Sequence, residues 1–316
     1  MITFCNSKCS IPIKSFSAKE LQKATNNFDE KQLLGGCSEW CGGRGGWGNY
    51  YKGFLQDRPV LIKKCIYDLM DNPIAINNSI NEIVYTSGTS VHRNVLKLLG
   101  CCLETDCPTL VFEYAEGQAL ADRIIDQKDV PWNVRLKIAI DLANAVAYLH
   151  TAFPRPIVHR NINVWIVFLD GNSAAKLSDF SLCVSIPEGE MYVEDVRAGS
   201  VGVVAPESYA SGYFNEKSDV YSFGVLLLVL LTGQRSIDNT RVEFLLVNHV
   251  KKYLGMNRFK EIFDPFILAE AAKEQQFESV GALAIKCIDD SAKTRPTMIE
   301  VAKELIRIYQ SAIAAC

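Results

Sequence analysis

The chain has 316 residues, of which 48% are hydrophobic and 22% are charged. This length excludes a small scaffold held together by disulfides, and this composition excludes a disordered chain, so we expect a folded protein with a sizeable core. Lys and Arg (33 residues) nearly balance Asp and Glu (36 residues), which leaves a net charge of −3 and excludes a general attraction to nucleic acid. We therefore predict no nucleic-acid partner.

No apolar run reaches the ~18 residues that a membrane-spanning helix needs, so we predict no transmembrane segment. The chain opens without the charged and apolar regions of a signal peptide, and we expect a cytoplasmic protein whose eleven cysteines stay reduced. Cys5 and Cys9 are candidate acylation sites that would hold the chain at the inner face of the plasma membrane. Cys37 and Cys41 repeat the spacing of that pair, but no histidine lies near them, which argues against zinc.

Residues 1–32 are polar and contain one helical pattern at 18–25. Ser17 precedes this pattern as a candidate N-cap, and Glu20 follows three residues later, which is the spacing of a capping box. We expect 1–32 to be an N-terminal segment that leads into the folded domain and is not a domain itself.

Short apolar runs separated by Gly, Pro, Asn and Asp fill residues 33–113, and this pattern predicts strands and turns. One helix is expected within this part, at about 76–87. The apolar period becomes helical farther along, at 134–149, 218–231 and 279–287. We predict an α+β protein in which a sheet-rich part precedes a larger helical part, with the apolar run 225–231 forming a buried helix.

A series of short motifs then appears in one fixed order. Gly43, Gly45 and Gly48 form G-x-G-x-x-G, Lys63 ends a strand pattern, and Glu82 lies on the next helix. The series continues with His159-Arg160-Asn161, Asp179-Phe180-Ser181, Ala205-Pro206-Glu207, Asp219 to Gly224, and Arg295-Pro296. This order resembles the protein-kinase signature set. The resemblance implies a bilobal protein-kinase-like domain at 33–316, with a small sheet-rich N-lobe (about 33–113) that carries one key helix and a larger helical C-lobe (about 114–316).

The text around these motifs resembles the receptor-like cytoplasmic kinases of plants, at 16–28, 92–104 and 219–224. Residues 11–14, 147–154 and 301–305 are similar to a small group of plant pseudokinases that act as adaptors or baits for a coiled-coil NLR immune receptor. The resemblance implies a role in plant immune signalling. Its partners would be that receptor and other receptor-like cytoplasmic kinases, with a pathogen effector as a further partner.

The catalytic positions depart from the family pattern, in which the loop reads H-R-D-x-K-x-x-N. Asn161 replaces the carboxylate, and an amide cannot take the proton of a substrate hydroxyl. Asn163 replaces the lysine, and Ile166 replaces an amide that would bind the second metal ion. We therefore expect no catalytic residue and no phosphotransfer. Asp179 remains as a single candidate magnesium ligand, although Ser181 stands where glycine is usual and would restrict the backbone.

Nucleotide binding is expected to be weak or absent, so that no cofactor is predicted and ATP and Mg²⁺ would bind only weakly. In active relatives, adenine is enclosed by smaller side chains at the positions of Tyr50, Leu61 and Phe168, and packed interiors absorb added carbons poorly. Lys63 and Glu82 can still form an ion pair. That pair either stabilises the fold or belongs to a vestigial nucleotide site together with the three glycines.

The positions that maintain the larger lobe are intact. By the resemblance, Glu207 and Arg295 form a buried pair, and Asp219 binds the backbone of the catalytic loop. Trp40 and Trp47 lie in a glycine-rich insertion, where they either form exposed anchors or fold back onto the sheet. Residues 181–204 carry several acidic side chains and no long apolar run, so we expect a mobile docking region for an incoming kinase, with the smaller lobe as a candidate for the receptor.

Three functions follow from these observations. A catalytically inactive adaptor is preferred, because scaffold positions are kept while catalytic positions are replaced. A weakly active or atypical Ser/Thr protein kinase is the enzymatic alternative, and an ATP-binding switch without transfer activity is the third.

Overall fold

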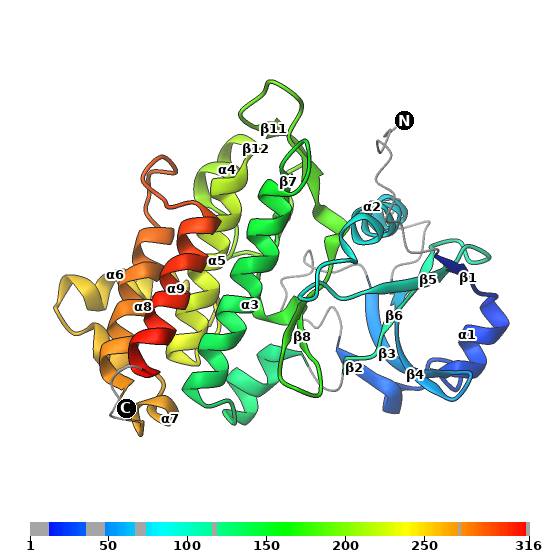
Figure 1. Ribbon diagram of the computed structural model, residues 1–316, viewed down its shortest axis with the longest axis horizontal. Helices are drawn as coiled ribbons and strands as arrows, with labels where there is room; N and C mark the ends of the chain where they lie inside the picture. The colour runs from blue at the N-terminus through cyan, green and yellow to red at the C-terminus, as the bar shows by residue number, and fades with distance from the viewer. Residues whose placement is uncertain (1–12, 36–47, 67–73, 116–118, 271–272, 314–316) are drawn as a thin grey trace.

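The computed structural model describes residues 13–35, 48–66, 74–115, 119–270 and 273–313. These residues form a small lobe built around a sheet and a larger lobe built from helices, which lie side by side in Figure 1. The arrangement confirms the α+β class and the bilobal fold that the motifs imply. Among the described residues, no helix has both the length and the apolar character needed to cross a bilayer.

The small lobe contains a six-stranded sheet with strand order β1-β5-β6-β4-β3-β2. All neighbours are antiparallel except β1, which runs parallel to β5. Gln56 and Asp57 connect β3 to β4 with positive φ angles of 50° and 59°, which suits the twist of a two-residue hairpin turn. The strands are β1 (Lys14–Ser15), β2 (Leu33–Gly35), β3 (Gly48–Leu55), β4 (Arg58–Cys65), β5 (Leu98–Cys102) and β6 (Thr109–Glu113).

The described part of the N-terminal segment packs onto this sheet. Ser17 caps α1 (Ala18–Ala24), and Glu20 completes the capping box that the sequence predicts. Leu21 is 1% exposed and lies in an apolar cluster with Val60, Ile62, Cys102 and Val111 of the sheet. Burying a leucine side chain is worth about 1.5–3 kcal/mol. Strand β1 and helix α1 are therefore parts of the small lobe, although the surrounding text is polar.

The predicted helices are present, each somewhat longer than its apolar pattern. They are α2 (Ile74–Thr89), α3 (Trp132–Thr151), α5 (Glu216–Thr232) and α8 (Glu274–Cys287). Every residue of 218–232 is buried, which explains why the run 225–231 is apolar on all sides of the helix. Helix α5 ends at Gly233, whose φ is 63° and where a Cβ would lie 2.8 Å from Oδ2 of Asp264. Only glycine fits that position without displacement.

The other helices of the larger lobe surround α5 and α3, as the yellow, orange and red ribbons of Figure 1 show. They are α4 (Pro206–Ser211), α6 (Leu246–Gly255), α7 (Pro265–Leu268) and α9 (Met298–Ile313). The single-turn and irregular helices are η1 (Glu30–Gln32), η3 (Asp122–Gln127), η4 (Val164–Ile166), η5 (Phe180–Leu182) and η6 (Phe259–Ile262). Three short strand pairs belong to the larger lobe: β7 (Ile157–Val158) with β10 (Val184–Ser185), β8 (Val167–Leu169) with β9 (Ala175–Leu177), and β11 (Val193–Glu194) with β12 (Tyr213–Phe214).

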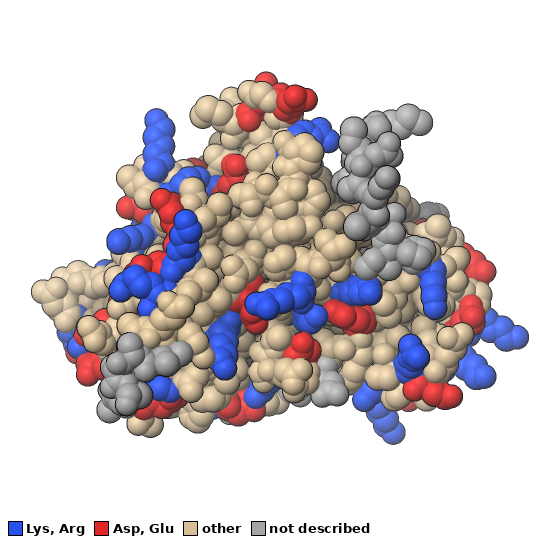
Figure 2. Space-filling view, viewed as in Figure 1, with Lys and Arg blue, Asp and Glu red and all other residues tan. Residues whose placement is uncertain are grey.

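Charged side chains of both signs are interspersed over the face in Figure 2, in line with the small net charge of −3. The described surface on this side carries no broad field of one sign. On this face, attraction to a partner through charge is therefore local.

Candidate functional site

Three charged side chains from three different elements meet where the lobes face each other. Nζ of Lys63 on β4 lies 2.7 Å from Oε2 of Glu82 on α2 and 2.9 Å from Oδ1 of Asp179 before η5. All three side chains are at most 3% exposed. Burial by itself lowers the pKa of Lys63, but the two carboxylates outweigh it and raise that pKa well above its usual value. The lysine therefore stays charged and joins strand, helix and loop.

The candidate magnesium ligand already has protein partners. Oδ1 of Asp179 accepts a hydrogen bond of 2.7 Å from Oγ of Ser181 in addition to the contact with Lys63. Asp179 also has a φ of 57°, in the left-handed region that L-residues adopt at some cost. The serine that replaces the usual glycine thus contributes a hydroxyl that holds this carboxylate in place.

The three side chains expected to fill the adenine space pack together. The rings of Tyr50 on β3 and Phe168 on β8 meet edge to face with centroids 4.9 Å apart. Leu61 on β4 is fully buried in the same apolar cluster, together with Phe112 and Ala115. Burial raises the pKa of the Tyr50 phenol, so the ring stays neutral near pH 7. These residues form a continuous apolar layer next to the charged cluster.

The glycine-rich motif is described only in part. Gly43 and Gly45 lie outside the described residues, whereas Gly48 begins β3. A Cβ at Gly48 would lie 2.5 Å from the carbonyl oxygen of Lys64 on the neighbouring strand. This glycine is therefore required by the close approach of β3 and β4, whether or not a phosphate ever binds.

The altered catalytic loop forms its own hydrogen-bond network. Oδ1 of Asn161 accepts from the backbone NH and the hydroxyl of Ser200, at 3.1 and 2.8 Å, and from the Asn163 amide at 3.2 Å. Oδ1 of Asn163 in turn accepts from the backbone NH of Trp165 at 2.9 Å. Ile166 is 6% exposed and belongs to the core of the larger lobe. The side-chain amides of Asn161 and Asn163 therefore hold the loop together and connect it to Ser200. The third altered position, Ile166, contributes only an apolar side chain.

The segment 181–204 is anchored at several points, although its sequence suggested mobility. Nη1 of Arg160 lies 2.8 Å from Oδ2 of Asp195, and the guanidinium stacks 4.0 Å from the ring of Phe214 on β12. Arg160 also donates to the backbone carbonyls of Leu182 and Val196. Because the guanidinium is buried and planar, it holds the start of the segment at Leu182 in a fixed relation to Asp195 and Val196.

Helix α2 contacts the same segment through residues that the sequence analysis did not single out. The side-chain amide of Asn81 donates to the carbonyl oxygens of Ser181 and Cys183, both at 2.8 Å. The hydroxyl of Tyr85 lies 3.2 Å from that of Ser185. The position of Asn81 next to Glu82 gave no signal of this role, because partners a hundred residues away are invisible to a local pattern. The contacts of Asp195 with Arg160 and of Ser200 with Asn161 were not predicted, because these partners too are distant in sequence.

Asp219 organises the start of the catalytic loop. Its carboxylate accepts the backbone NH groups of His159 and Arg160, each at 2.8 Å, and lies 2.9 Å from Nε2 of His150. The ring of His159 contacts that of Phe180 with centroids 5.1 Å apart. Burial lowers the pKa of His159, so the imidazole is neutral near pH 7. The loop is thus built as in the family pattern, up to the residue where that pattern would place the base.

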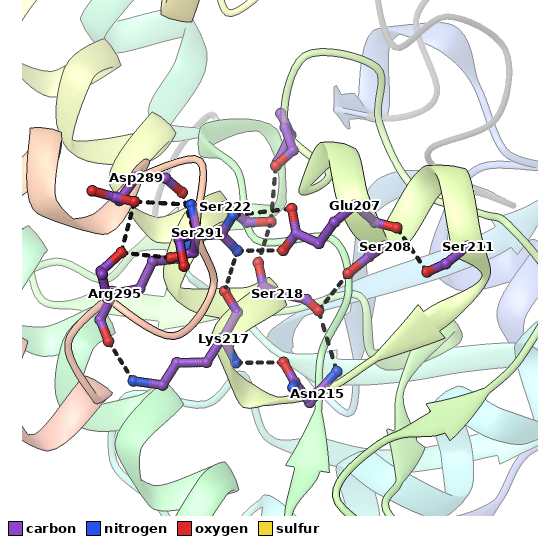
Figure 3. A network of polar contacts seen from close by, with 12 residues as sticks. Glu207, Ser208, Ser211, Asn215, Lys217, Ser218, Ser222, Asp289, Ser291 and Arg295 are labelled. Carbon is purple, nitrogen blue, oxygen red and sulfur yellow. Dashed lines mark hydrogen bonds and ion pairs between the residues drawn. The ribbon is translucent and has the colours of Figure 1, made fainter.

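A bidentate ion pair anchors the chain beyond the segment (Figure 3). Nη1 and Nη2 of Arg295 donate to the two carboxylate oxygens of Glu207 at 2.5 and 3.0 Å. Nε of Arg295 donates to the carbonyl oxygen of Asp289, and Lys217 donates to the carbonyl oxygen of Arg295. Arg295 is fully buried, but the Glu207 side chain is 39% exposed, so the pair expected to be buried is open to solvent on its acidic side.

Several candidate residues cannot be placed. Cys5, Cys9, Cys37, Cys41, Trp40 and Trp47 lie outside the described residues. Within the ranges that the structure describes, no three side chains of His, Cys, Asp or Glu gather closely enough to hold a metal ion.

Comparisons with known proteins show to which family the chain is similar. Residues 42–305 match the family "Protein tyrosine and serine/threonine kinase". The chain is 42% identical to the non-functional pseudokinase ZED1 of Arabidopsis thaliana, over 93% of this chain and 88% of that protein. It is 38% identical to the serine/threonine-protein kinase ZRK1 of the same plant, over 98% of this chain and 89% of the relative. It is also 38% identical to the non-functional pseudokinase ZRK2 of Arabidopsis thaliana, over 98% of this chain and 86% of that protein.

Proposed function

The chain belongs to the protein tyrosine and serine/threonine kinase family, and we propose that it is a catalytically inactive pseudokinase that acts as an adaptor or bait in plant immune signalling. Its partners would be a coiled-coil NLR immune receptor and receptor-like cytoplasmic kinases, with a pathogen effector as the signal. It would work in the cytoplasm or at the inner face of the plasma membrane. This proposal combines the altered site with the resemblance set out above.

One observation carries the catalytic part of the proposal. Asn161 stands where the general base of the family would stand, and its amide oxygen already accepts three hydrogen bonds. An amide has no useful basicity, and phosphoryl transfer depends on positioned charge, which Asn163 and Ile166 do not supply. Two of the relatives named above are called non-functional pseudokinases, which supports the same conclusion.

The nucleotide part of the proposal rests on packing. Tyr50, Leu61 and Phe168 are at most 6% exposed and in one cluster, at the positions that enclose adenine in active kinases. Admitting a purine ring would require these side chains to move out of a close-packed layer. We therefore expect ATP and Mg²⁺ to bind weakly or not at all, and no step of the function is assigned to them.

A second candidate function has its own support. The cluster of Lys63, Glu82 and Asp179 is assembled as a phosphate and metal site of an active kinase requires, which favours a nucleotide-binding switch. One relative is also named a serine/threonine-protein kinase. Activity and binding must therefore be measured separately.

We expect neither phosphotransfer nor nucleotide binding. The purified chain, incubated with labelled Mg-ATP and a general substrate, should transfer no label above a blank without protein. Millimolar Mg-ATP should leave the melting temperature unchanged, because ligand stabilisation scales as RT ln(1 + [L]/Kd). Label transfer would establish the kinase, and a thermal shift without transfer would establish the switch.

A matched variant tests whether the apolar layer of Tyr50, Leu61 and Phe168 is what prevents nucleotide binding. Tyr50→Val combined with Leu61→Ala and Phe168→Leu removes volume from the layer and leaves the charged cluster intact. We expect this variant to gain a Mg-ATP-dependent thermal shift and still to transfer no label. If the original chain and the variant respond alike, the three side chains do not control nucleotide access.

The proposed adaptor role is tested at the exposed tip of the segment 181–204, which we define as Met191 and Tyr192. Their side chains are 78% and 46% exposed. Acidic side chains lie at the top of the molecule in Figure 2, over the region labelled β11 in Figure 1. Replacing Met191 and Tyr192 together by Ser should weaken binding to purified receptor-like cytoplasmic kinases by about tenfold or more, as for an interface hot spot. These substitutions spare Asp195 and the buried Ile186, so the segment keeps its anchors.

Val242→Ser is the matched control, because Val242 is 90% exposed on another part of the larger lobe. Its binding should equal that of the original chain. Unchanged affinity after the double substitution would remove the segment tip from the proposal, and binding that requires added Mg-ATP would favour the switch.

A further inference from the structure

Two cysteines that are distant in sequence meet at the edge of the small lobe. Cys65 is the last residue of β4, and Cys107 lies two residues before β6, the neighbour of β4 in the sheet. Cys107 is 8% exposed and belongs to the apolar cluster against which Cys65 packs. In the pairing of β4 with β6, Lys63 lies opposite Leu110, so the adjacent ends of these two strands bring Cys65 and Cys107 onto the same apolar cluster. The sulfur of Cys107 also lies 3.7 Å from the carbonyl oxygen of Ala75, in the first turn of α2.

The other described cysteines offer weaker partners. Cys101 and Cys102 are consecutive on β5, and consecutive side chains of a strand point to opposite faces of the sheet. Cys102 belongs to another apolar cluster, and Cys101 shares the cluster of Cys107 but lies on β5, which β6 separates from β4 and Cys65. Cys183 and Cys287 are buried in the core of the larger lobe.

The two thiols of the pair differ in reactivity. Cys65 is half-buried, whereas Cys107 is buried. Burial raises the pKa of the Cys107 thiol to about 12, and the neighbouring Cys65 thiol acts in the same direction. Cys107 is therefore a poor initial nucleophile, and attack on an oxidant falls to the thiolate of Cys65.

We propose that Cys65 and Cys107 are a site of oxidative modification, at which a hydroperoxide converts the two thiols into a reversible disulfide. The Cys65 thiolate attacks one peroxide oxygen, the O–O bond breaks, and the leaving oxygen departs as water, or as an alcohol from an organic hydroperoxide. The Cys107 sulfur then attacks the resulting sulfenic acid, the S–O bond breaks, and a water molecule leaves. Two thiols give up two electrons and two protons to one peroxide.

The disulfide would have a defined structural effect. It closes a loop that contains the whole of α2 (Ile74–Thr89), the helix that carries Glu82. It also removes the thiol hydrogen that Cys107 directs at Ala75. Oxidation would therefore restrain β4 relative to the start of β6 and change the first turn of α2. In a reducing compartment a bond of this kind is transient, since small thiols return it to the dithiol by exchange.

Peptide mapping tests the proposal on the full chain. Reduced protein is treated with hydrogen peroxide while folded, its remaining thiols are alkylated, and the digest is analysed by mass spectrometry without reductant. We expect a linked peptide that joins Cys65 to Cys107, with the mass of two hydrogen atoms lost, and we expect dithiothreitol to abolish it. Recovery of both residues as free thiols, or a dominant link between other cysteines, would overturn the proposal.

Two variants assign the steps. In Cys107→Ser the sulfenic acid of Cys65 has no thiol to react with, so a dimedone-type trap should label Cys65 more strongly than in the original chain. Cys101→Ser is the matched control and should keep the linked peptide. Equal trapping at Cys65 in the original chain and in Cys107→Ser would contradict the order of steps.

Discussion

Lys63 illustrates how a single residue joins the two lobes. Its ammonium group is surrounded by protein, where an isolated charge would be costly, and two carboxylates compensate for the lost water. The same arrangement makes each partner dependent on the others. Removing the lysine would leave Glu82 and Asp179 as buried carboxylates of like charge, which either ionise at high cost or take up protons.

We therefore expect Lys63→Ala to lower the free energy of unfolding by about 3–5 kcal/mol, the usual cost of breaking a buried pair from one side. Lys64→Ala is the matched control, because Lys64 is the exposed neighbour on the same strand and contacts the ring of Phe28. Its cost should be about 1 kcal/mol or less. Guanidinium unfolding of the three proteins measures both values.

A second substitution separates lost charge balance from lost packing. Adding Glu82→Gln to Lys63→Ala removes one of the unpaired carboxylates, so the double variant should be more stable than the sum of the single effects predicts. Additive losses would mean that the cluster contributes through packing alone.

At the level of single residues, the sequence indicated which side chains carry chemistry but not every partner. The Lys63–Glu82 pair could be anticipated because the signature motifs fix both roles, and the structure contains it. The contact between Arg160 and Asp195 could not be selected, because Glu188, Glu190 and Glu194 lie in the same stretch of sequence. Which acidic residue faces the arginine depends on the turn of the chain at β11.

At the level of elements, long periodic segments were predictable and short ones were not. Helices α2, α3, α5 and α8 each bury a face or a whole surface that the apolar period marks. Strand β1 has two residues, and its place in the sheet comes from pairing with β5, more than eighty positions away. A polar segment therefore joins the lobe through a two-residue strand, the buried Leu21 and a few partly buried apolar side chains such as Phe16 and Phe28.

The segment 181–204 also shows how tertiary contacts override composition. Its acidic sequence predicted mobility, but Ile186 is buried with Val158 and Phe214, and β11 pairs with β12. Anchors near both ends leave Met191 and Tyr192 exposed between them. Such a surface loses less conformational entropy on binding than a mobile loop would, which favours a partner that docks on a preformed tip.

At the level of the whole molecule, buried and half-buried titratable groups make the free energy of unfolding depend on pH. Burial lowers the pKa of three histidines below the ordinary value of 6.5: His92, His159 and His249. Asp122 and Asp141 act in the opposite sense, since burial raises the pKa of each from 3.8. The two aspartates affect the free energy of unfolding at a lower pH than the histidines do.

These shifts fix the sign of the pH dependence between neutral and mildly acidic solution. Below about pH 6.5 the unfolded chain binds more protons at His92, His159 and His249 than the folded chain does, so the free energy of unfolding falls as the pH falls. The slope is at most about 1.4 kcal/mol per pH unit for each histidine, and above about pH 7.5 this contribution is constant. Guanidinium unfolding at a series of pH values across this window measures the slope. His159→Gln should reduce the slope by the contribution of one histidine, because the amide does not titrate but keeps a hydrogen-bonding group. If the variant and the original chain lose stability in parallel, protonation of His159 is not what destabilises the fold.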